Sequence, residues 1–182
     1  MPLAVAIAGR MGSGKTTLAL AISTAFGWPR ASFGDYVRSE VMKRGLSLSR
    51  NNLQVIGTEL LEADVPLFCS RVLAGSGWRP GQGLVIDGLR HSETIDPICK
   101  LIYPLPLKIV LIEVDDLIRK ARLAQKGESG EIAVREADAH SSEKQVATTF
   151  ERLADLIVDG SQTPGSIFKE VAEWIGEQRL SD

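Results

Sequence analysis

Hydrophobic positions along the chain fall either in short continuous runs or in longer stretches with helical spacing. The run at 3–8 is bounded by glycine and suits a strand buried on both faces. The stretch at 16–26 has helical spacing and ends at Gly27 and Pro29. The same pattern predicts strands at 3–8, 31–33, 84–87, 108–114 and 156–158. It predicts helices at 16–26, 35–44, 49–61, 66–73, 93–100, 116–126, 143–154 and 167–178. The helix at 93–100 should be interrupted near Pro97. Because strands alternate with helices throughout, we expect an α/β fold around a parallel sheet.

Composition narrows the class of protein. The chain has 182 residues, 44% of them hydrophobic and 24% charged, which suits one globular domain over residues 1–182. Its net charge of −2 gives no basic field for nucleic acid, so we expect no specific nucleic-acid partner. The apolar runs are too short to span a membrane, and the first run lacks the basic flank of a signal peptide. Cys69 and Cys99 fit no paired pattern, so we expect reduced, mostly buried thiols in a cytoplasmic protein, either a monomer or a homodimer.

The strongest motif is G-x-x-x-x-G-K-[ST] at 9–16, between the first strand and the first helix. Its glycines let successive N–H groups converge on phosphates, and the helix N-terminus adds partial positive charge. Lys15 should reach the outer phosphates of ATP and assist their transfer, while the Thr16 hydroxyl ligates Mg²⁺. The predicted nucleotide-binding residues here are Gly9, Gly12, Ser13, Gly14, Lys15, Thr16 and Thr17, of which Thr17 either touches a phosphate or packs.

This motif predicts triphosphate binding without identifying the reaction, because kinases, ATPases and GTPases share it. The Asn-Lys-x-Asp segment with which GTPases read their base does not occur in the sequence.

Two aspartate–arginine pairs follow predicted strands. Asp87 ends the strand at 84–87, where a carboxylate beside the phosphate loop could hold Mg²⁺ or its waters. Arg90 follows, and its guanidinium could clamp an anionic acceptor. Asp35 and Arg38 repeat the arrangement one helical turn apart, although a helix-capping aspartate with a surface arginine explains that pair equally well. Together the pairs favour an acceptor that carries phosphate.

These residues resemble the nucleoside monophosphate kinase branch of P-loop proteins. Gly-Asp-Tyr-Val-Arg at 34–38 resembles the G-D-x-[LIV]-R segment of adenylate kinases, and Asp-Gly-Leu-Arg at 87–90 resembles their D-G-F-P-R segment with one residue fewer. In that family both arginines bind the acceptor's phosphate. The resemblance therefore implies that Arg38 and Arg90 bind the substrate, and we expect Asp35 to lie at the same substrate site.

The resemblance extends over nearly the whole chain. The segment 114–126 is similar to the strand and helix that lead into the lid, which implies that Arg122 and Lys126 contact the donor phosphates. A short lid at about 127–142 contains a single arginine, Arg135, to which a catalytic role would fall. Segments 32–60 and 153–160 resemble most closely an archaeal-type kinase-like family related to adenylate and dephospho-CoA kinases.

The resemblance also implies an architecture. We expect the three-layer P-loop NTPase fold, with a five-stranded parallel sheet in the order 2-3-1-4-5 and helices on both faces. The helical segment at about 35–74 would bind the acceptor.

We therefore expect an ATP- and Mg²⁺-dependent kinase that acts on a small phosphorylated acceptor, foremost a nucleoside or deoxynucleoside monophosphate. Dephospho-CoA kinase is the alternative enzyme, and an ATP-binding switch or ATPase is the alternative of another class. Asp35 has two possible roles: it would take a proton from a hydroxyl acceptor, or it would only orient groups if the nucleophile is a phosphate.

Overall fold

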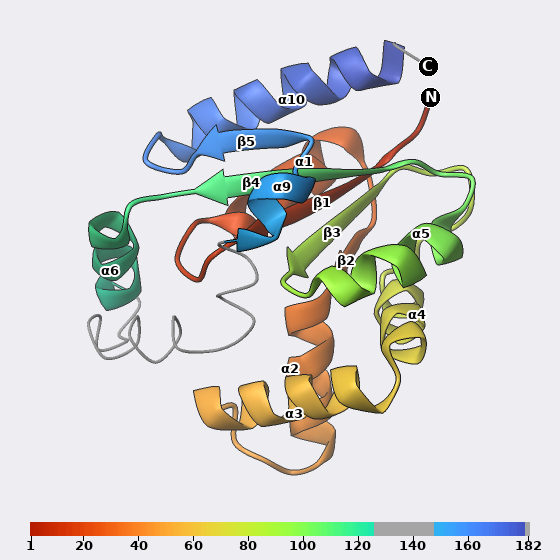
Figure 1. Cartoon of the computed structure of the whole chain (residues 1–182), viewed down its shortest axis with the longest axis vertical. Coiled ribbons are helices and arrows are strands. Elements are labelled where there is room, and N and C mark those ends of the chain that lie inside the picture. Colours follow the sequence, from red (N-terminus) through yellow and green to blue (C-terminus); the bar gives the residue numbers. More distant parts are fainter. Residues whose placement is uncertain (126–147, 181–182) are drawn as a thin grey trace.

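A computed structural model describes residues 1–125 and 148–180. Its centre is a five-stranded, all-parallel sheet in the order β2-β3-β1-β4-β5 (Figure 1). The strands are β1 Ala4–Gly9, β2 Arg30–Ser32, β3 Leu84–Leu89, β4 Leu107–Glu113 and β5 Leu156–Asp159. The sequence prediction of a parallel sheet in this order is confirmed.

Helices cover both faces of the sheet. The helices of the described residues are α1 Lys15–Phe26, α2 Phe33–Lys43, α3 Arg50–Ala63, α4 Val65–Gly75, the 3₁₀ helix η1 Ser92–Thr94, α5 Ile95–Ile102, α6 Asp116–Gln125, α9 Phe150–Leu153 and α10 Pro164–Leu180. Side chains of β1 alternate between two cores. Ala4, Ala6 and Ala8 face a core that includes residues of α4, α5 and α9, whereas Val5 and Ile7 face a core with α1 and α10. This alternation gives the three layers that the sequence predicts.

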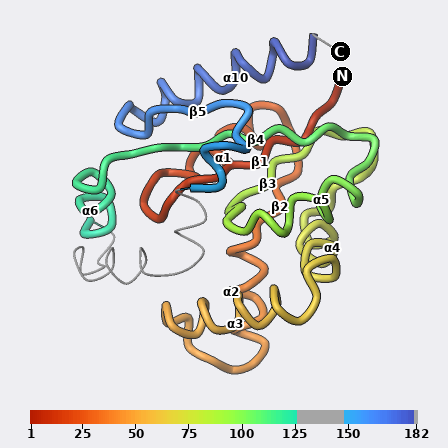
Figure 2. The backbone as a smooth tube through the Cα atoms, in the orientation of Figure 1, coloured from red at the N-terminus to blue at the C-terminus, as the bar shows by residue number. Residues whose placement is uncertain are grey.

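One pair of helices lies outside the layers. The helices α2 and α3 extend away from the sheet as a pair (Figures 1 and 2). Arg44 at the end of α2 joins Glu59 of α3 through two hydrogen bonds of 2.7 and 2.9 Å. At the opposite end Met1 lies beside the last turn of α10, since the Met1 ammonium donates to the carbonyl of Arg179 at 2.7 Å (Figure 2).

Some sequence predictions need correction. Phe33 begins α2 instead of ending the second strand, because Ser32 caps that helix by accepting from the Asp35 N–H. Asp87 lies within β3, which continues to Leu89 through a bulge at Gly88 (φ 84°). Pro97 does not interrupt α5, because it lies in the first turn, where its missing N–H is not needed.

The thiols also differ from expectation. Cys69 is buried and burial raises its pKa to about 11, but Cys99 is exposed on α5, so the expectation of two mostly buried thiols is wrong. Cys99 is exposed because it lies on the outward side of α5, a short amphipathic helix.

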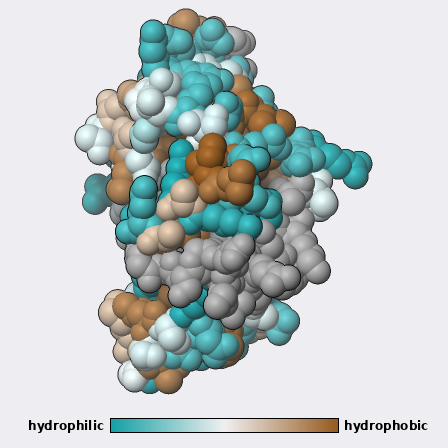
Figure 3. Space-filling model, turned by 90° about the vertical axis from the view of Figure 1, so that its left-hand side faces the viewer, coloured by the Kyte–Doolittle hydropathy of each residue, from teal (hydrophilic) through white to brown (hydrophobic). Residues whose placement is uncertain are grey.

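The surface in Figure 3 shows hydrophobic residues in separate groups among hydrophilic ones, with one group at the lower end, where α2 and α3 lie. Within residues 1–125 and 148–180, no helix is long and apolar enough to cross a membrane. The predicted helix at 143–154 is described only in part, and the predicted lid at about 127–142 lies outside the described residues.

Candidate active site

The phosphate loop joins a fully buried strand to a helix. Every residue of β1 is buried, which fixes where the loop starts. Gly9, Gly12 and Gly14 have φ values of 149°, 82° and 101°, in the region that favours glycine. A Cβ at Gly12 would lie 3.2 Å from the carbonyl oxygen of Arg119, so α6 packs directly against the loop. α1 begins at Lys15, so its N-terminus, which is suited to anions, lies within the loop.

Two of the cations predicted for the donor phosphates, Lys15 and Arg122, lie at this loop. Lys15 is 7% exposed, and its Nζ donates to the carbonyl of Arg10 at 2.8 Å. Arg122 reaches the loop from α6, donating to the carbonyls of Ser13 at 3.3 Å and Gly160 at 2.8 Å. Ser13 is buried, and Thr16 and Thr17 are exposed at the start of α1. The other predicted cations, Lys126 and Arg135, lie outside the described residues.

Sequence reasoning missed Arg119. Its side chain is fully buried, and its Nε donates to the carbonyl of Met11 in the phosphate loop at 2.8 Å. Its Nη1 donates to Asp116 Oδ1 at 2.7 Å, and the same oxygen accepts from Arg10 Nη1 at 3.0 Å. Two adjacent residues of the loop, Arg10 and Met11, are therefore hydrogen-bonded to side chains of α6. Its place on α6, one turn before Arg122, was the available signal, but helical spacing alone does not reveal a contact with Met11.

The two predicted aspartate–arginine pairs are joined by a residue that the sequence did not single out. Thr16 Oγ1 donates to Asp87 Oδ1 at 3.3 Å, and Arg30 Nη1 donates to Asp87 Oδ2 at 2.6 Å. Arg30 Nη2 donates to Asp35 Oδ2 at 2.5 Å, and Arg38 Nη1 donates to Asp35 Oδ1 at 2.7 Å. We call Thr16, Asp87, Arg30, Asp35 and Arg38 the charge chain. It runs from the phosphate loop to α2, with negative and positive groups alternating after Thr16.

The arginines around Asp35 affect the pKa of its carboxyl. Partial burial by itself would raise the pKa of the Asp35 carboxyl, but hydrogen bonds from Arg30 and Ser32, with the charges of Arg30 and Arg38, hold that pKa below its ordinary value. A carboxylate with one arginine on each oxygen is a poor proton acceptor.

The residues predicted for Mg²⁺ fit that ion. Thr16 and Asp87 offer a hydroxyl and a carboxylate oxygen 3.3 Å apart, and Mg²⁺ prefers oxygen ligands together with nucleotide phosphates and water. Because Arg30 takes Asp87 Oδ2, the Oδ1 atom is the one turned toward Thr16. Elsewhere in residues 1–125 and 148–180, no cluster of three or more His, Cys, Asp or Glu is arranged to hold a metal.

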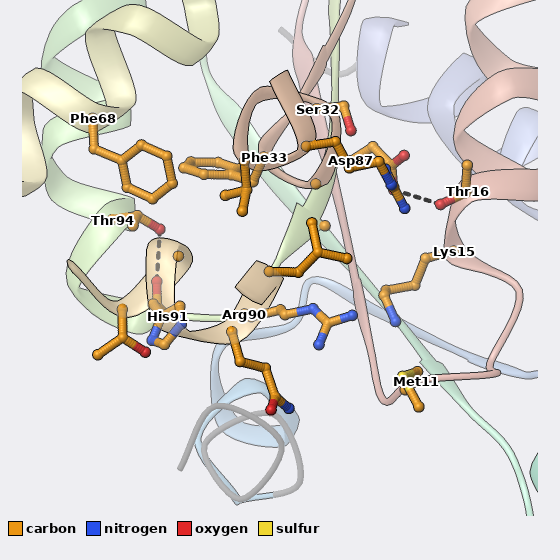
Figure 4. A pocket seen from close by; sticks show the side chains of 18 of the residues that line it. Met11, Lys15, Thr16, Ser32, Phe33, Phe68, Asp87, Arg90, His91 and Thr94 are labelled. Carbon is orange, nitrogen blue, oxygen red and sulfur yellow. Dashed lines mark hydrogen bonds between the residues drawn. The ribbon is translucent and has the colours of Figure 1, made fainter. Parts of the chain in front are cut away.

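A cavity of about 400 Å³ opens beside the loop (Figure 4). Its lining combines the loop and α1, the α2–α3 pair, α4, and the end of β3 with the segment that follows. Figure 4 shows Arg90 and Lys15 reaching into it from different sides, while Phe33 and Phe68 form an aromatic wall. Those two rings meet edge to face, with centroids 5.2 Å apart.

The cavity brings together predicted residues from the donor side and the acceptor side, but Gly9, Gly12, Ser13, Gly14, Thr17 and Arg122 do not line it. Its lining includes Lys15, Thr16, Asp87, Arg38 and Arg90. Asp35 is outside the lining and acts on it through Arg38. Arg50 and Gln54 of α3 also line it, as does His91, which follows Arg90.

The sequence of the chain matches a known family model and two curated proteins. A family model described as an AAA domain matches residues 5–151. A UPF0200 protein of Aeropyrum pernix is 32% identical over 98 residues, covering 54% of this chain and 52% of that protein. A UPF0200 protein of Thermococcus kodakarensis is 33% identical over 99 residues, covering 50% of each. This chain thus spans about half the length of the curated relatives it matches.

Solved structures share the fold. A gluconokinase from Sinorhizobium meliloti has a TM-score of 0.55 at 18% identity, covering 100% of this chain and 98% of that chain. A sugar kinase from Janibacter has a TM-score of 0.54 at 18% identity, covering 97% and 95%. They confirm the predicted P-loop kinase fold, and the family model with the two archaeal relatives confirms the resemblance to an archaeal-type family. At this identity the solved structures show the fold alone.

Proposed function

Because this chain belongs to the AAA domain family, we propose that it is an ATP- and Mg²⁺-dependent kinase that transfers the γ-phosphate to a small phosphorylated acceptor. One observation carries the proposal: a single cavity is lined both by Lys15 and Thr16 of the phosphate loop and by Arg38 and Arg90. A switch or an ATPase needs a triphosphate site. It does not need paired arginines from other elements in the same cavity.

The chemistry of the cavity favours a nucleoside or deoxynucleoside monophosphate. Phe33, Val37 and Phe68 supply an apolar surface suited to a planar base, and Arg38 and Arg90 supply charge for a phosphate. A sugar acid has no planar apolar group for those aromatic rings. The proposed acceptor therefore differs from the gluconate and sugar for which the structurally similar kinases are named.

The proposed transfer depends on positioning and charge. Arg38 and Arg90 would hold the acceptor's phosphate in line with the γ-phosphate, while Lys15 and Arg122 would stabilise charge on the donor oxygens. Mg²⁺, when bound with ATP between Thr16 and Asp87, would supply further charge neutralisation. A phosphate nucleophile needs no base, and the two arginines on Asp35 support an orienting role for that residue.

Dephospho-CoA kinase is the second candidate, because a hydroxyl acceptor would use a base near the position of Asp35. The lowered pKa of Asp35 counts against it.

A panel assay tests the proposal. The protein is incubated with ATP and Mg²⁺, and ADP release is measured with each ribonucleoside and deoxynucleoside monophosphate, dephospho-CoA and gluconate. We expect stimulation by one or more nucleoside monophosphates. Stimulation by dephospho-CoA or gluconate alone would reject the monophosphate assignment, and release independent of every acceptor would support an ATPase or switch.

A further inference from the structure

The charge chain joins the magnesium-binding end of the cavity to its acceptor-binding end. Asp87 lies beside Thr16, Arg38 lines the acceptor side, and Arg30 with Asp35 stands between them. The Asp87 side chain is 5% exposed and that of Arg30 is 20% exposed, so solvent screens their pairing weakly. Low exposure makes Asp87 and Arg30 sensitive to the charges of their neighbours, whereas the side chains of Asp35 and Arg38 are each 52% exposed.

Arg30 is shared between two carboxylates. Its Nη1 lies 2.6 Å from Asp87 and its Nη2 lies 2.5 Å from Asp35. Asp35 is shared in turn, because Arg38 occupies its other oxygen at 2.7 Å. When one partner of a shared group is neutralised, the group interacts more strongly with the partner that remains.

We propose that Arg30 is a positioning residue through which an anion bound at Arg38 tightens the binding of the magnesium–nucleotide complex at Asp87. An acceptor phosphate on Arg38 would draw that guanidinium away from Asp35. Asp35 would then interact more strongly with Arg30, and Asp87 would keep more of its negative charge for Mg²⁺. The inference rests on the proposed function, because it takes Arg38 as an acceptor-binding group and Asp87 as a magnesium-binding group.

Reciprocity follows from thermodynamics: if the acceptor tightens binding of the magnesium–nucleotide complex, that complex tightens binding of the acceptor by the same factor. Such a coupling would favour formation of the complete ternary complex over binding of either substrate alone.

The test needs neither acceptor nor turnover. The dissociation constant of the non-hydrolysable analogue AMP-PNP is measured by calorimetry with Mg²⁺ and with EDTA, and their ratio is the magnesium gain. We expect Asp35→Asn to lower the magnesium gain by about fivefold or more and Arg38→Gln to raise it by a similar factor. In the Arg30→Gln background, both effects should fall below about twofold. Arg71→Gln, on the exposed side of α4, is the control for removing an arginine charge elsewhere.

The outcomes separate coupling through the charge chain from its alternatives. Equal effects of Asp35→Asn with and without Arg30 would show a field acting through space and would overturn the proposal. An unchanged magnesium gain in both Asp35→Asn and Arg38→Gln would overturn it as well. Because the measurement involves no acceptor, the expected changes in the magnesium gain together with a failed acceptor panel would reject the proposed reaction and would still show that Asp35 and Arg38 act on Asp87 through Arg30. Failure of the wild type to bind AMP-PNP would contradict both.

Discussion

Arg30 and Asp87 form an ion pair of 2.6 Å between neighbouring strands, with Asp87 almost completely buried. The pairing of β2 with β3 brings them together, since Arg30 lies opposite Val85 and Ser32 opposite Asp87. Removing the arginine leaves the buried Asp87 carboxylate with the hydrogen bond from the Thr16 hydroxyl but without its counter-charge. A buried charge without its counter-charge is destabilising.

We therefore predict that Arg30→Ala lowers the free energy of unfolding by about 2 kcal/mol, while Arg30→Ala combined with Asp87→Asn recovers part of that loss. Urea unfolding of the single and double variants measures both. Additive losses from the two substitutions would contradict the pairing, because independent sites add and coupled sites do not.

The contact with Arg119 predicts that Gly12 tolerates no side chain. Gly12→Ala places a Cβ at φ 82° and 3.2 Å from the backbone oxygen of Arg119, so the loop must shift. We expect a loss of about 1 to 3 kcal/mol in stability and at least about tenfold weaker ATP binding.

A matched glycine in α10 provides the control for this substitution. Gly176 has open space around its would-be Cβ and lies inside the helix, so Gly176→Ala should stabilise the protein by about 0.5 to 1 kcal/mol. Thermal melting and calorimetric ATP titration compare the two variants. Equal behaviour of both would contradict the argument for close packing at Gly12.

Part of this architecture was predictable from local pattern. The run at 3–8, the motif at 9–16 and the alternation of strands with helices predict the layers and the phosphate loop, because each depends on residues close in the sequence. The Asp35–Arg38 ion pair was found for the same reason, since the two residues are three positions apart.

Arg30 could not be found in this way. It lies 57 residues from Asp87, and its contact arises only when β2 and β3 pair in register. Arg119 and Met11 are 108 residues apart and meet only when α6 packs on the loop. The predicted strand ends at Asp87, whereas the structure continues β3 to Leu89 through a bulge at Gly88.

The lowered pKa of Asp35 gives a prediction about pH. A carboxyl whose pKa is depressed by folding contributes stability above its unfolded pKa of about 4, and that contribution is lost as pH falls through the folded pKa. The difference in unfolding free energy between wild type and Asp35→Asn should be constant above about pH 5 and shrink below about pH 4. Urea titrations across this range measure it. A difference that grows on acidification would show that the pKa is raised instead.

Arg38 and Arg90 should act on the acceptor and spare the nucleotide. Arg38→Ala and Arg90→Ala each remove one guanidinium from the acceptor side of the cavity, so we expect the acceptor's KM to rise about tenfold or more. The dissociation constant of ATP measured with EDTA should change by less than about twofold. Parallel losses of ATP and acceptor binding would mean that these arginines serve the donor or the fold.

The central claim is that one cavity holds both a triphosphate and its acceptor, and following the transferred phosphate tests it most directly. With γ-³²P-labelled ATP, Mg²⁺ and the best nucleoside monophosphate of the panel, label should appear on the acceptor. Lys15→Ala should reduce that transfer by about 100- to 1,000-fold with an unchanged melting temperature, while Lys43→Ala, at an exposed ion pair with Glu40, should leave it unaffected. Label released only as inorganic phosphate, or transfer that persists in Lys15→Ala, would contradict the claim.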